Sequence, residues 1–265
     1  MSDRSVSAEA QVQAEAELAK QLLSATDRER QKLYGTVYDE IYSMHLSRDP
    51  ATLEFGATPR MLPFLLKLTR PGEPVLEIGC GAGLIAIELA RAGRQVTALE
   101  VSEVVLDHAR RRAAGVSGVH FEKVDGITVP HPDASFETAY SIEVIEHLHE
   151  QDAIAHFAEV HRLLRPGGRY WFATPSRLGS VGASERFGVE VAADADVHLK
   201  EWTYSELGHI LARAGFNRLS VPVRVHRAQF LPWMPFALAM RAERARSRLL
   251  RRLLGVGAIS VVARR

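Results

Sequence analysis

Short apolar runs alternate with longer amphipathic segments from about residue 74 to the end of the chain. The short runs are rich in β-branched and aromatic residues and predict strands, whereas the longer segments space their apolar residues as helices do. The predicted strands are 75–78, 96–99, 119–124, 136–142, 170–173, 216–225 and 258–263, and the predicted helices are 84–92, 103–114, 151–164 and 204–214. This alternation predicts an α/β fold with a doubly wound, mostly parallel seven-stranded sheet, whose ligand crevice lies beyond the carboxyl ends of its strands.

The first 70 residues follow a different pattern and predict helical structure ahead of the sheet domain, 71–265. Residues 1–30 are rich in Ala, Glu and Gln with few large apolar groups, so we expect a flexible or helical N-terminal arm. Within a predicted helical cap, 31–70, Tyr34, Tyr38 and Tyr42 recur every four residues and share one helix face. This stripe either docks the cap on the core or places a tyrosine against a ligand pocket.

A glycine loop after the first predicted strand is the strongest functional motif. Gly79, Gly81 and Gly83 follow an apolar run that contains Glu77, and a predicted helix begins directly after them. Glycines at a helix N-terminus let the backbone approach a ligand closely, and Glu100, at the end of the next strand, is placed to bind a ribose diol. The site suits an adenosine-type cofactor, but the third glycine comes one residue too early for a dinucleotide fingerprint.

These residues resemble motif I of the class I S-adenosylmethionine-dependent methyltransferases, whose pattern is acidic-x-Gly-x-Gly-x-Gly. The resemblance implies that Glu77 helps hold the cationic amino-acid end of the cofactor and that Glu100 holds the ribose hydroxyls. It also implies that Asp125 accepts a hydrogen bond from the adenine amino group, although Asp-Gly is an ordinary turn as well. The residues expected at the cofactor are Glu77, Gly79, Cys80, Gly81, Gly83, Glu100, Val101, Asp125, Gly126, Ser141 and Ile142.

A second polar group follows the fourth predicted strand. If a helical turn begins there, Glu143, Glu146 and His147 lie on one face, and His198 precedes a later helix. Two carboxylates and two imidazoles suit Mn, Fe, Co or Zn better than Mg. The element resembles the metal-binding segment of small-RNA 3′-terminal 2′-O-methyltransferases, and it also resembles metal-independent quinone-pathway and small-molecule O-methyltransferases. Metal ligands, acid–base groups and hydrogen-bonded structural groups are therefore three open interpretations.

The resemblance implies methyl transfer, and a hydroxyl acceptor must then lose its proton. His147 is the best candidate for the general base, because an unperturbed imidazole has a pKa of about 6.5. His198 is the second candidate. We expect the acceptor to be a hydroxyl of a small or lipophilic molecule. The alternatives are a metal-dependent RNA 2′-O-methyltransferase and a catalytically silent scaffold that binds S-adenosylmethionine.

Two further segments carry expectations about binding. The polar, glycine-containing loop 174–199 lies beside the predicted crevice and is a candidate lid for the acceptor. The segment 230–255 joins an aromatic, proline-broken run to a basic amphipathic helix. Such a helix either packs by its leucines with its arginines in solvent, or contacts an anionic membrane peripherally.

Composition narrows the class of protein. A net charge of +1 over 265 residues disfavours nucleic acid as a partner. The single cysteine, Cys80, allows no disulfide framework, and the N-terminus lacks the apolar segment of a signal peptide. We therefore expect a cytoplasmic protein.

Overall fold

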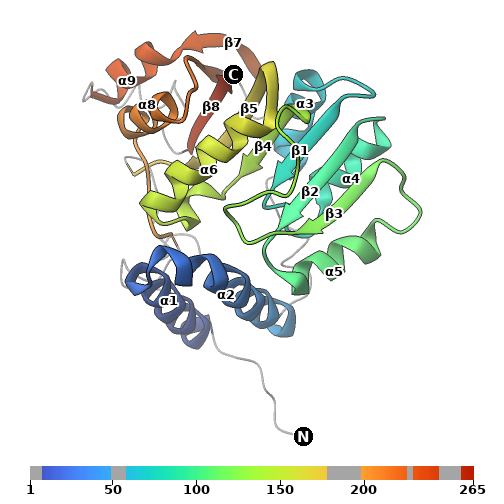
Figure 1. Ribbon diagram of the computed structural model, residues 1–265, viewed down its shortest axis with the longest axis vertical. Helices are drawn as coiled ribbons and strands as arrows, with labels where there is room; N and C mark the ends of the chain where they lie inside the picture. Colours follow the sequence, from blue (N-terminus) through green and yellow to red (C-terminus); the bar gives the residue numbers. More distant parts are fainter. Residues whose placement is uncertain (1–7, 49–57, 178–197, 226–228, 245–257) are drawn as a thin grey trace, which may run out of the picture.

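The described residues of the computed structural model, 8–48, 58–177, 198–225, 229–244 and 258–265, form an α/β fold around an eight-stranded sheet (Figure 1). The strands are β1 (Pro74–Ile78), β2 (Gln95–Glu100), β3 (Val119–Lys123), β4 (Phe136–Ile142), β5 (Leu164–Pro175), β6 (Arg218–Val225), β7 (Gln229–Pro235) and β8 (Ala258–Arg264). Their order is β3-β2-β1-β4-β5-β8-β6-β7. The five strands from β3 to β5 are parallel, β8 runs antiparallel to both β5 and β6, and β7 runs antiparallel to β6.

Helices cover both faces of the sheet. They are α1 (Ala8–Ser24), α2 (Asp27–Arg48), α3 (Thr58–Leu68), α4 (Leu84–Arg91), α5 (Glu103–Arg112), α6 (Glu150–Leu163), α8 (Tyr204–Arg213) and α9 (Phe236–Arg244), with a short 3₁₀ turn, η2 (Ile145–His147). Side chains alternate along each strand, so in β1 Leu76 and Ile78 pack with α6 and α8, whereas Val75 packs with α3, α4 and α5. The alternating arrangement of strand and helix predicted from the sequence is confirmed.

The sheet has one strand more than predicted, and this corrects the interpretation of 230–255. Residues 229–235 form β7 at the sheet edge, where its two prolines, Pro232 and Pro235, are tolerated because an edge strand need not donate every N–H. Helix α9 follows directly. The arginine-rich part of the predicted amphipathic helix, 245–257, lies outside the described residues, as does most of the predicted lid, 178–197.

The Arg165-Pro-Gly-Gly168 segment follows the end of α6 and belongs to β5. Gly167 has a φ of 81°, a left-handed conformation that favours glycine. A Cβ at Gly168 would lie 2.8 Å from the carbonyl oxygen of Arg165. The two glycines therefore let the chain turn sharply and enter the strand at once.

Helices α1 and α2 lie across the carboxyl ends of the parallel strands (Figure 1). The Arg30 guanidinium donates to both carboxylate oxygens of Asp152 in α6, at 2.7 and 3.1 Å. The hydroxyl of Ser102 and the N–H of Val104, at the start of α5, donate to Oδ1 of Asp39. Helix α2 is thus fixed to the sheet domain on two sides.

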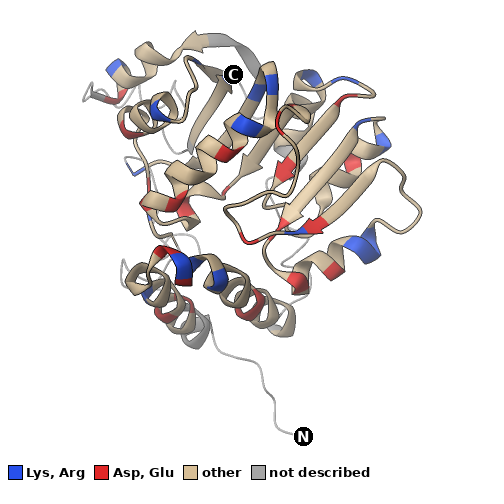
Figure 2. Ribbon diagram, viewed as in Figure 1, with Lys and Arg blue, Asp and Glu red and all other residues tan. Residues whose placement is uncertain are grey.

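Charges of both signs are interspersed over the described elements, and Lys and Arg do not gather on one element in Figure 2. No helix among these elements combines the length and apolar character needed to cross a membrane.

Candidate functional site

A cavity lies where the carboxyl ends of β1, β2 and β4 face α2. Its space is about 640 Å³, counting the part that is open to solvent. The lining residues come from α2, from three strand ends and from the turn after β4. They are Tyr34, Tyr38, Tyr42, Ile78, Gly79, Leu99, Glu100, Val101, Val124, Gly126, Glu143, Val144, His147 and Leu148.

The glycine loop after β1 is built from left-handed residues. Gly79, Gly81 and Gly83 have φ values of 70°, 50° and 73°. A Cβ at Gly79 would lie 2.5 Å from Cγ2 of Val144, and a Cβ at Gly83 would lie 2.7 Å from Cε1 of Phe121. Both the backbone conformation and the close packing therefore favour glycine at these two positions.

The N–H groups of this loop are already engaged within the protein. Those of Gly79 and Cys80 both donate to the carbonyl oxygen of Leu99 at 2.9 Å, and that of Gly81 donates to Oε2 of Glu100 at 2.9 Å. Gly79 lines the cavity, whereas Cys80, Gly81 and Gly83 are not among its lining residues. The loop therefore shapes the cavity by close backbone approach.

Glu100 lines the cavity at the end of β2 and is only 5% exposed. Its Oε1 accepts from the N–H groups of Val101 and Ser102 at 2.8 and 3.1 Å, in addition to the bond from Gly81. Burial raises the pKa of this carboxyl, and the three N–H donors partly offset the effect. These bonds fix the position of the carboxylate against the cavity.

Glu77 does not line the cavity. It is buried on the same face of β1 as Val75, beside Tyr140 of β4. Burial raises its pKa to about 8, and the nearby Tyr140 hydroxyl and Ala86 N–H partly offset this shift. Its Oε2 has no hydrogen-bond partner among the described residues. At pH 7 the carboxyl of Glu77 is therefore mostly protonated in the free protein.

The other residues expected at the cofactor occupy varied positions. Gly126 and Val101 line the cavity, whereas Asp125, Ser141 and Ile142 do not. Oδ1 of Asp125 accepts from the N–H groups of Ile127 and Thr128, and its Oδ2 accepts from Gln31 of α2 at 2.9 Å. Asp125 thus stabilises a turn and contacts the helix above it. Its adenine contact stays a prediction, as do the cofactor roles of the whole set.

Ser141 belongs to a buried polar chain that the sequence did not indicate. Its Oγ lies 2.6 Å from the hydroxyl of Tyr170, which lies 3.0 Å from Nε2 of His156. Burial lowers the pKa of His156 to about 4, so its ring is neutral near pH 7. The hydroxyl of Ser141 is therefore hydrogen-bonded to Tyr170 in the core. The backbone of Ser141 lies between those of β1 and β5 in the sheet.

All three tyrosines of the α2 stripe line the cavity. The hydroxyl of Tyr34 donates to Oδ2 of Asp152 at 2.7 Å and accepts from the N–H of His149 at 3.0 Å. The ring of Tyr38 packs edge-on against that of His147, with 5.8 Å between centroids. The stripe therefore both docks the cap and forms the roof of the pocket, so the two interpretations of its spacing are compatible.

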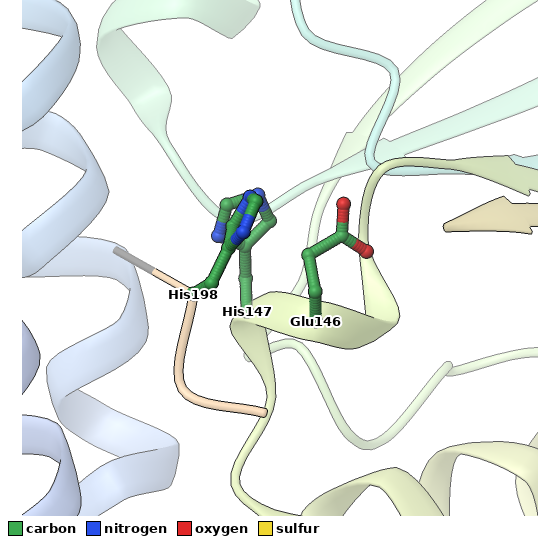
Figure 3. Close-up of side chains that lie close together, drawn as sticks. All are labelled: Glu146, His147 and His198. Carbon is green, nitrogen blue, oxygen red and sulfur yellow. The ribbon is translucent and has the colours of Figure 1, made fainter. Parts of the chain in front are cut away.

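Glu146, His147 and His198 come together beside the cavity, which His147 lines (Figure 3). Their potential ligand atoms all lie within 4.8 Å of one another, and the two imidazole centroids are 5.1 Å apart. Thr174 donates to Oε2 of Glu146 at 2.8 Å, and Nδ1 of His198 lies 3.4 Å from Oε1 of Glu201. One carboxylate and two imidazoles thus form a preorganised group.

Glu143 lies outside this group, which corrects the expected arrangement on one helix face. Only the three-residue turn η2 forms after β4, and Glu143 precedes it with a φ of 52°. The side chain of Glu143 is exposed and lines the cavity, whereas Glu146 is fully buried. A full α-helical turn is required to place residues i, i+3 and i+4 on one face.

The anchoring residues of α2 were missed by sequence reasoning, although a signal for one of them exists. Arg30 lies four residues before Tyr34 and so continues the stripe of Tyr34, Tyr38 and Tyr42. A charged residue on a buried helix face requires a partner of opposite charge, here Asp152. The partner itself is 122 positions away in the chain, and no local pattern identifies it.

Comparisons with known proteins agree with this geometry. A family model described as "Methyltransferase domain" matches residues 75–168. The 27-O-demethylrifamycin SV methyltransferase of Amycolatopsis mediterranei is 35% identical over 191 residues, which cover 63% of this chain and 69% of that protein. A probable S-adenosylmethionine-dependent methyltransferase of Mycolicibacterium smegmatis is 34% identical over 147 residues, 55% of this chain and 52% of that protein.

A ubiquinone biosynthesis O-methyltransferase of Xanthomonas euvesicatoria is 31% identical over 149 residues, 55% of this chain and 57% of that protein. The chain thus spans little more than half the length of two of these three relatives. Among solved structures, an S-adenosylmethionine-dependent methyltransferase from Mesorhizobium loti shares 25% identity with a TM-score of 0.55, covering 80% of this chain and all of that one.

Proposed function

The chain belongs to the class I S-adenosylmethionine-dependent methyltransferases, and on this premise we propose that it methylates a hydroxyl oxygen of a small or lipophilic molecule. The observation that carries the proposal is the cavity, in which Glu100 and Gly79 of the cofactor motif and His147 line one continuous space. The names of two relatives, a rifamycin-type and a ubiquinone-pathway O-methyltransferase, support an oxygen acceptor. The mostly apolar roof supports a lipophilic one.

In this proposal the cofactor lies along the strand ends. Glu100 accepts hydrogen bonds from the ribose hydroxyls, Val101 and Gly126 lie beside the adenosine, and Asp125 would accept from the adenine amino group. Glu77 would pair with the ammonium group at the amino-acid end of the cofactor. Because Glu77 is mostly protonated without ligand, an approaching ammonium group favours loss of that proton, and binding generates the ion pair.

The reaction itself needs alignment and one proton transfer. The acceptor oxygen attacks the methyl carbon, the carbon–sulfur bond breaks, and S-adenosylhomocysteine leaves with the electron pair on sulfur. The imidazole of His147, which lines the cavity, takes the proton of the acceptor hydroxyl. His198, whose ring lies 5.1 Å from that of His147, is placed to support its orientation or to serve as an alternative base.

Glu100→Ala is expected to weaken binding of S-adenosylhomocysteine by about 1.5–3 kcal/mol, the scale of hydrogen bonds to a charged group. Isothermal titration calorimetry on the wild type and the variant measures this difference. Glu100→Gln keeps the size of the side chain and removes its charge, but its NH2 group replaces one of the two oxygens that accept from backbone N–H groups, so it should also weaken binding. Glu103→Ala, three residues further on an exposed side of α5, is the matched control and should leave affinity unchanged. Tight NAD binding without S-adenosylhomocysteine binding would refute the proposed function.

A second candidate function is metal-dependent methylation of an RNA 2′-hydroxyl, and the group of Glu146, His147 and His198 is the observation in its favour. The donor set fits Mn, Fe, Co or Zn, with one carboxylate oxygen and two imidazole nitrogens. A bound ion would lower the pKa of the acceptor hydroxyl. The near-neutral charge of the chain and the scattered Lys and Arg side chains of the described elements favour a small acceptor over RNA.

For the small-molecule reaction we expect full methyltransferase activity in excess chelator. Product formation is followed with labelled cofactor, before and after dialysis against the chelator. If activity is lost and added Mn or Co restores it, the metal-dependent reaction becomes the leading function. Glu146→Gln and His198→Ala should then each reproduce the chelator effect, because loss of one ligand cripples a three-residue site.

The remaining expectations stay predictions. They are the acceptor role of the lid 174–199, peripheral membrane contact through 230–255, and a cytoplasmic location. Turnover in any acceptor assay would exclude the alternative of a catalytically silent scaffold.

A further inference from the structure

The charged side chains that line the cavity are all acidic among the described residues. Glu100 and Glu143 line it, and no Lys or Arg does so. The amino-acid end of S-adenosylmethionine carries both an ammonium and a carboxylate. Acidic side chains suit the ammonium, but the carboxylate must take its hydrogen bonds from neutral donors.

Four of the nearest backbone donors are already engaged. The N–H groups of Gly79, Cys80 and Gly81 already donate to Leu99 and Glu100, and that of Gly83 donates to the carbonyl oxygen of Cys80. A helix N-terminus usually provides the anion site in such folds, but here the loop ahead of α4 directs these four N–H groups inward. Side-chain hydroxyls on the opposite wall are the alternative.

The opposite wall is the tyrosine stripe of α2, and Tyr38 differs from Tyr34 in one respect. The Tyr34 hydroxyl has two partners, Asp152 and His149, whereas the Tyr38 hydroxyl is buried and has no hydrogen-bond partner among the described residues. Burial raises the pKa of Tyr38 well above its usual value, so the hydroxyl keeps its proton. A buried hydroxyl without a hydrogen-bond partner destabilises the folded protein. We therefore expect an atom of the ligand to accept its hydrogen bond.

The position of Tyr38 along the cavity identifies the part of the ligand that it meets. A Cβ at Gly126, at the adenosine end, would lie 3.6 Å from Cδ2 of Tyr34, and one at Gly81 would lie 3.6 Å from the hydroxyl of Tyr42. The stripe therefore runs from the adenosine end towards the glycine loop. Tyr38 lies between them on the same helix face, with its ring against that of His147.

We propose that the hydroxyl of Tyr38 donates a hydrogen bond to the α-carboxylate of S-adenosylmethionine. The inference rests on the proposed function, and it adds to the cofactor site a residue of the helical cap, outside the matched methyltransferase model at 75–168. Cofactor binding then completes a contact between α2 and the sheet domain.

Two ligands that differ only in the amino-acid end test the assignment. S-adenosylhomocysteine has the carboxylate, whereas 5′-methylthioadenosine keeps the adenosine and the thioether and lacks the amino-acid group. Tyr38→Phe should raise the Kd of S-adenosylhomocysteine about tenfold or more, as for a lost hydrogen bond to a charged group, and change that of 5′-methylthioadenosine less than twofold. Calorimetry measures both.

Ser43→Ala is the control, because it removes an exposed hydroxyl of the same helix that lies outside the cavity lining. It should leave both affinities within about twofold. Tyr42→Phe, which also alters the cavity lining, tests whether the neighbouring hydroxyl makes the contact instead. Thermal unfolding of Tyr38→Phe without ligand should match the wild type, since no protein hydrogen bond is lost. Equal weakening of both ligands, no weakening, or a loss that follows Tyr42→Phe instead would overturn the assignment. If wild type binds neither ligand, the proposed function fails and not this inference alone.

Discussion

Replacing His147 by alanine is expected to slow methyl transfer about 10²-fold or more while the affinity for S-adenosylmethionine changes little. The imidazole lines the cavity beside the tyrosine roof, and it is a different group from Glu100, which is proposed to bind the ribose. Removing a general base affects the transition state, in which the acceptor proton moves, more than the bound ground state. Steady-state kinetics with labelled cofactor give the rate, and calorimetry gives the affinity.

His120→Ala is a suitable control, since its side chain is 74% exposed on β3 and distant from the cavity lining. The pH dependence of the rate distinguishes the loss of a general base from the loss of a packing contact. A base that must be neutral gives a rate that rises with pH through its pKa, and this limb should disappear in the variant. If the rate and the profile are both unaltered, His147 is a packing residue only.

Arg30→Ala is expected to lower the free energy of unfolding by about 3–5 kcal/mol, the range for breaking a buried ion pair by removing one partner. Arg30 is only 2% exposed, and its loss would leave Asp152 buried without its cation. The Tyr34 hydroxyl donates to the same carboxylate, so the roof of the cavity should loosen as well. Urea unfolding followed by circular dichroism measures the difference.

Arg28→Ala removes an exposed arginine from the same helix and should change stability by less than about 0.5 kcal/mol. The double variant Arg30→Ala, Asp152→Ala should recover part of the loss, because no uncompensated charge stays buried. A fall of less than about 1 kcal/mol in Arg30→Ala would show that α2 is held by its apolar contacts alone.

Local patterns predicted most of the central strands and helices to within a few residues, because alternation of apolar residues and the placement of glycines act over short distances. Strand β5 is an exception, since it begins at Leu164 whereas the predicted strand began at residue 170. The same patterns failed where the tertiary context decided the outcome. Residues 229–235 became a strand because β6 offered a free edge, and Glu143 left the helical face because only one 3₁₀ turn forms between β4 and α6. Neither neighbour is encoded in the segment itself.

The sequence by itself determined the family, the glycine loop and the acidic residues Glu77 and Glu100, since each of these follows from residue type and spacing along one βαβ unit. Only the tertiary structure decided which groups share a cavity. It brought the roof of Tyr34, Tyr38 and Tyr42 over the strand ends, joined Glu146 and His147 to His198, and engaged the loop N–H groups inward. These arrangements join segments far apart in the chain, where packing and buried polar pairing, and not local spacing, determine which residues meet.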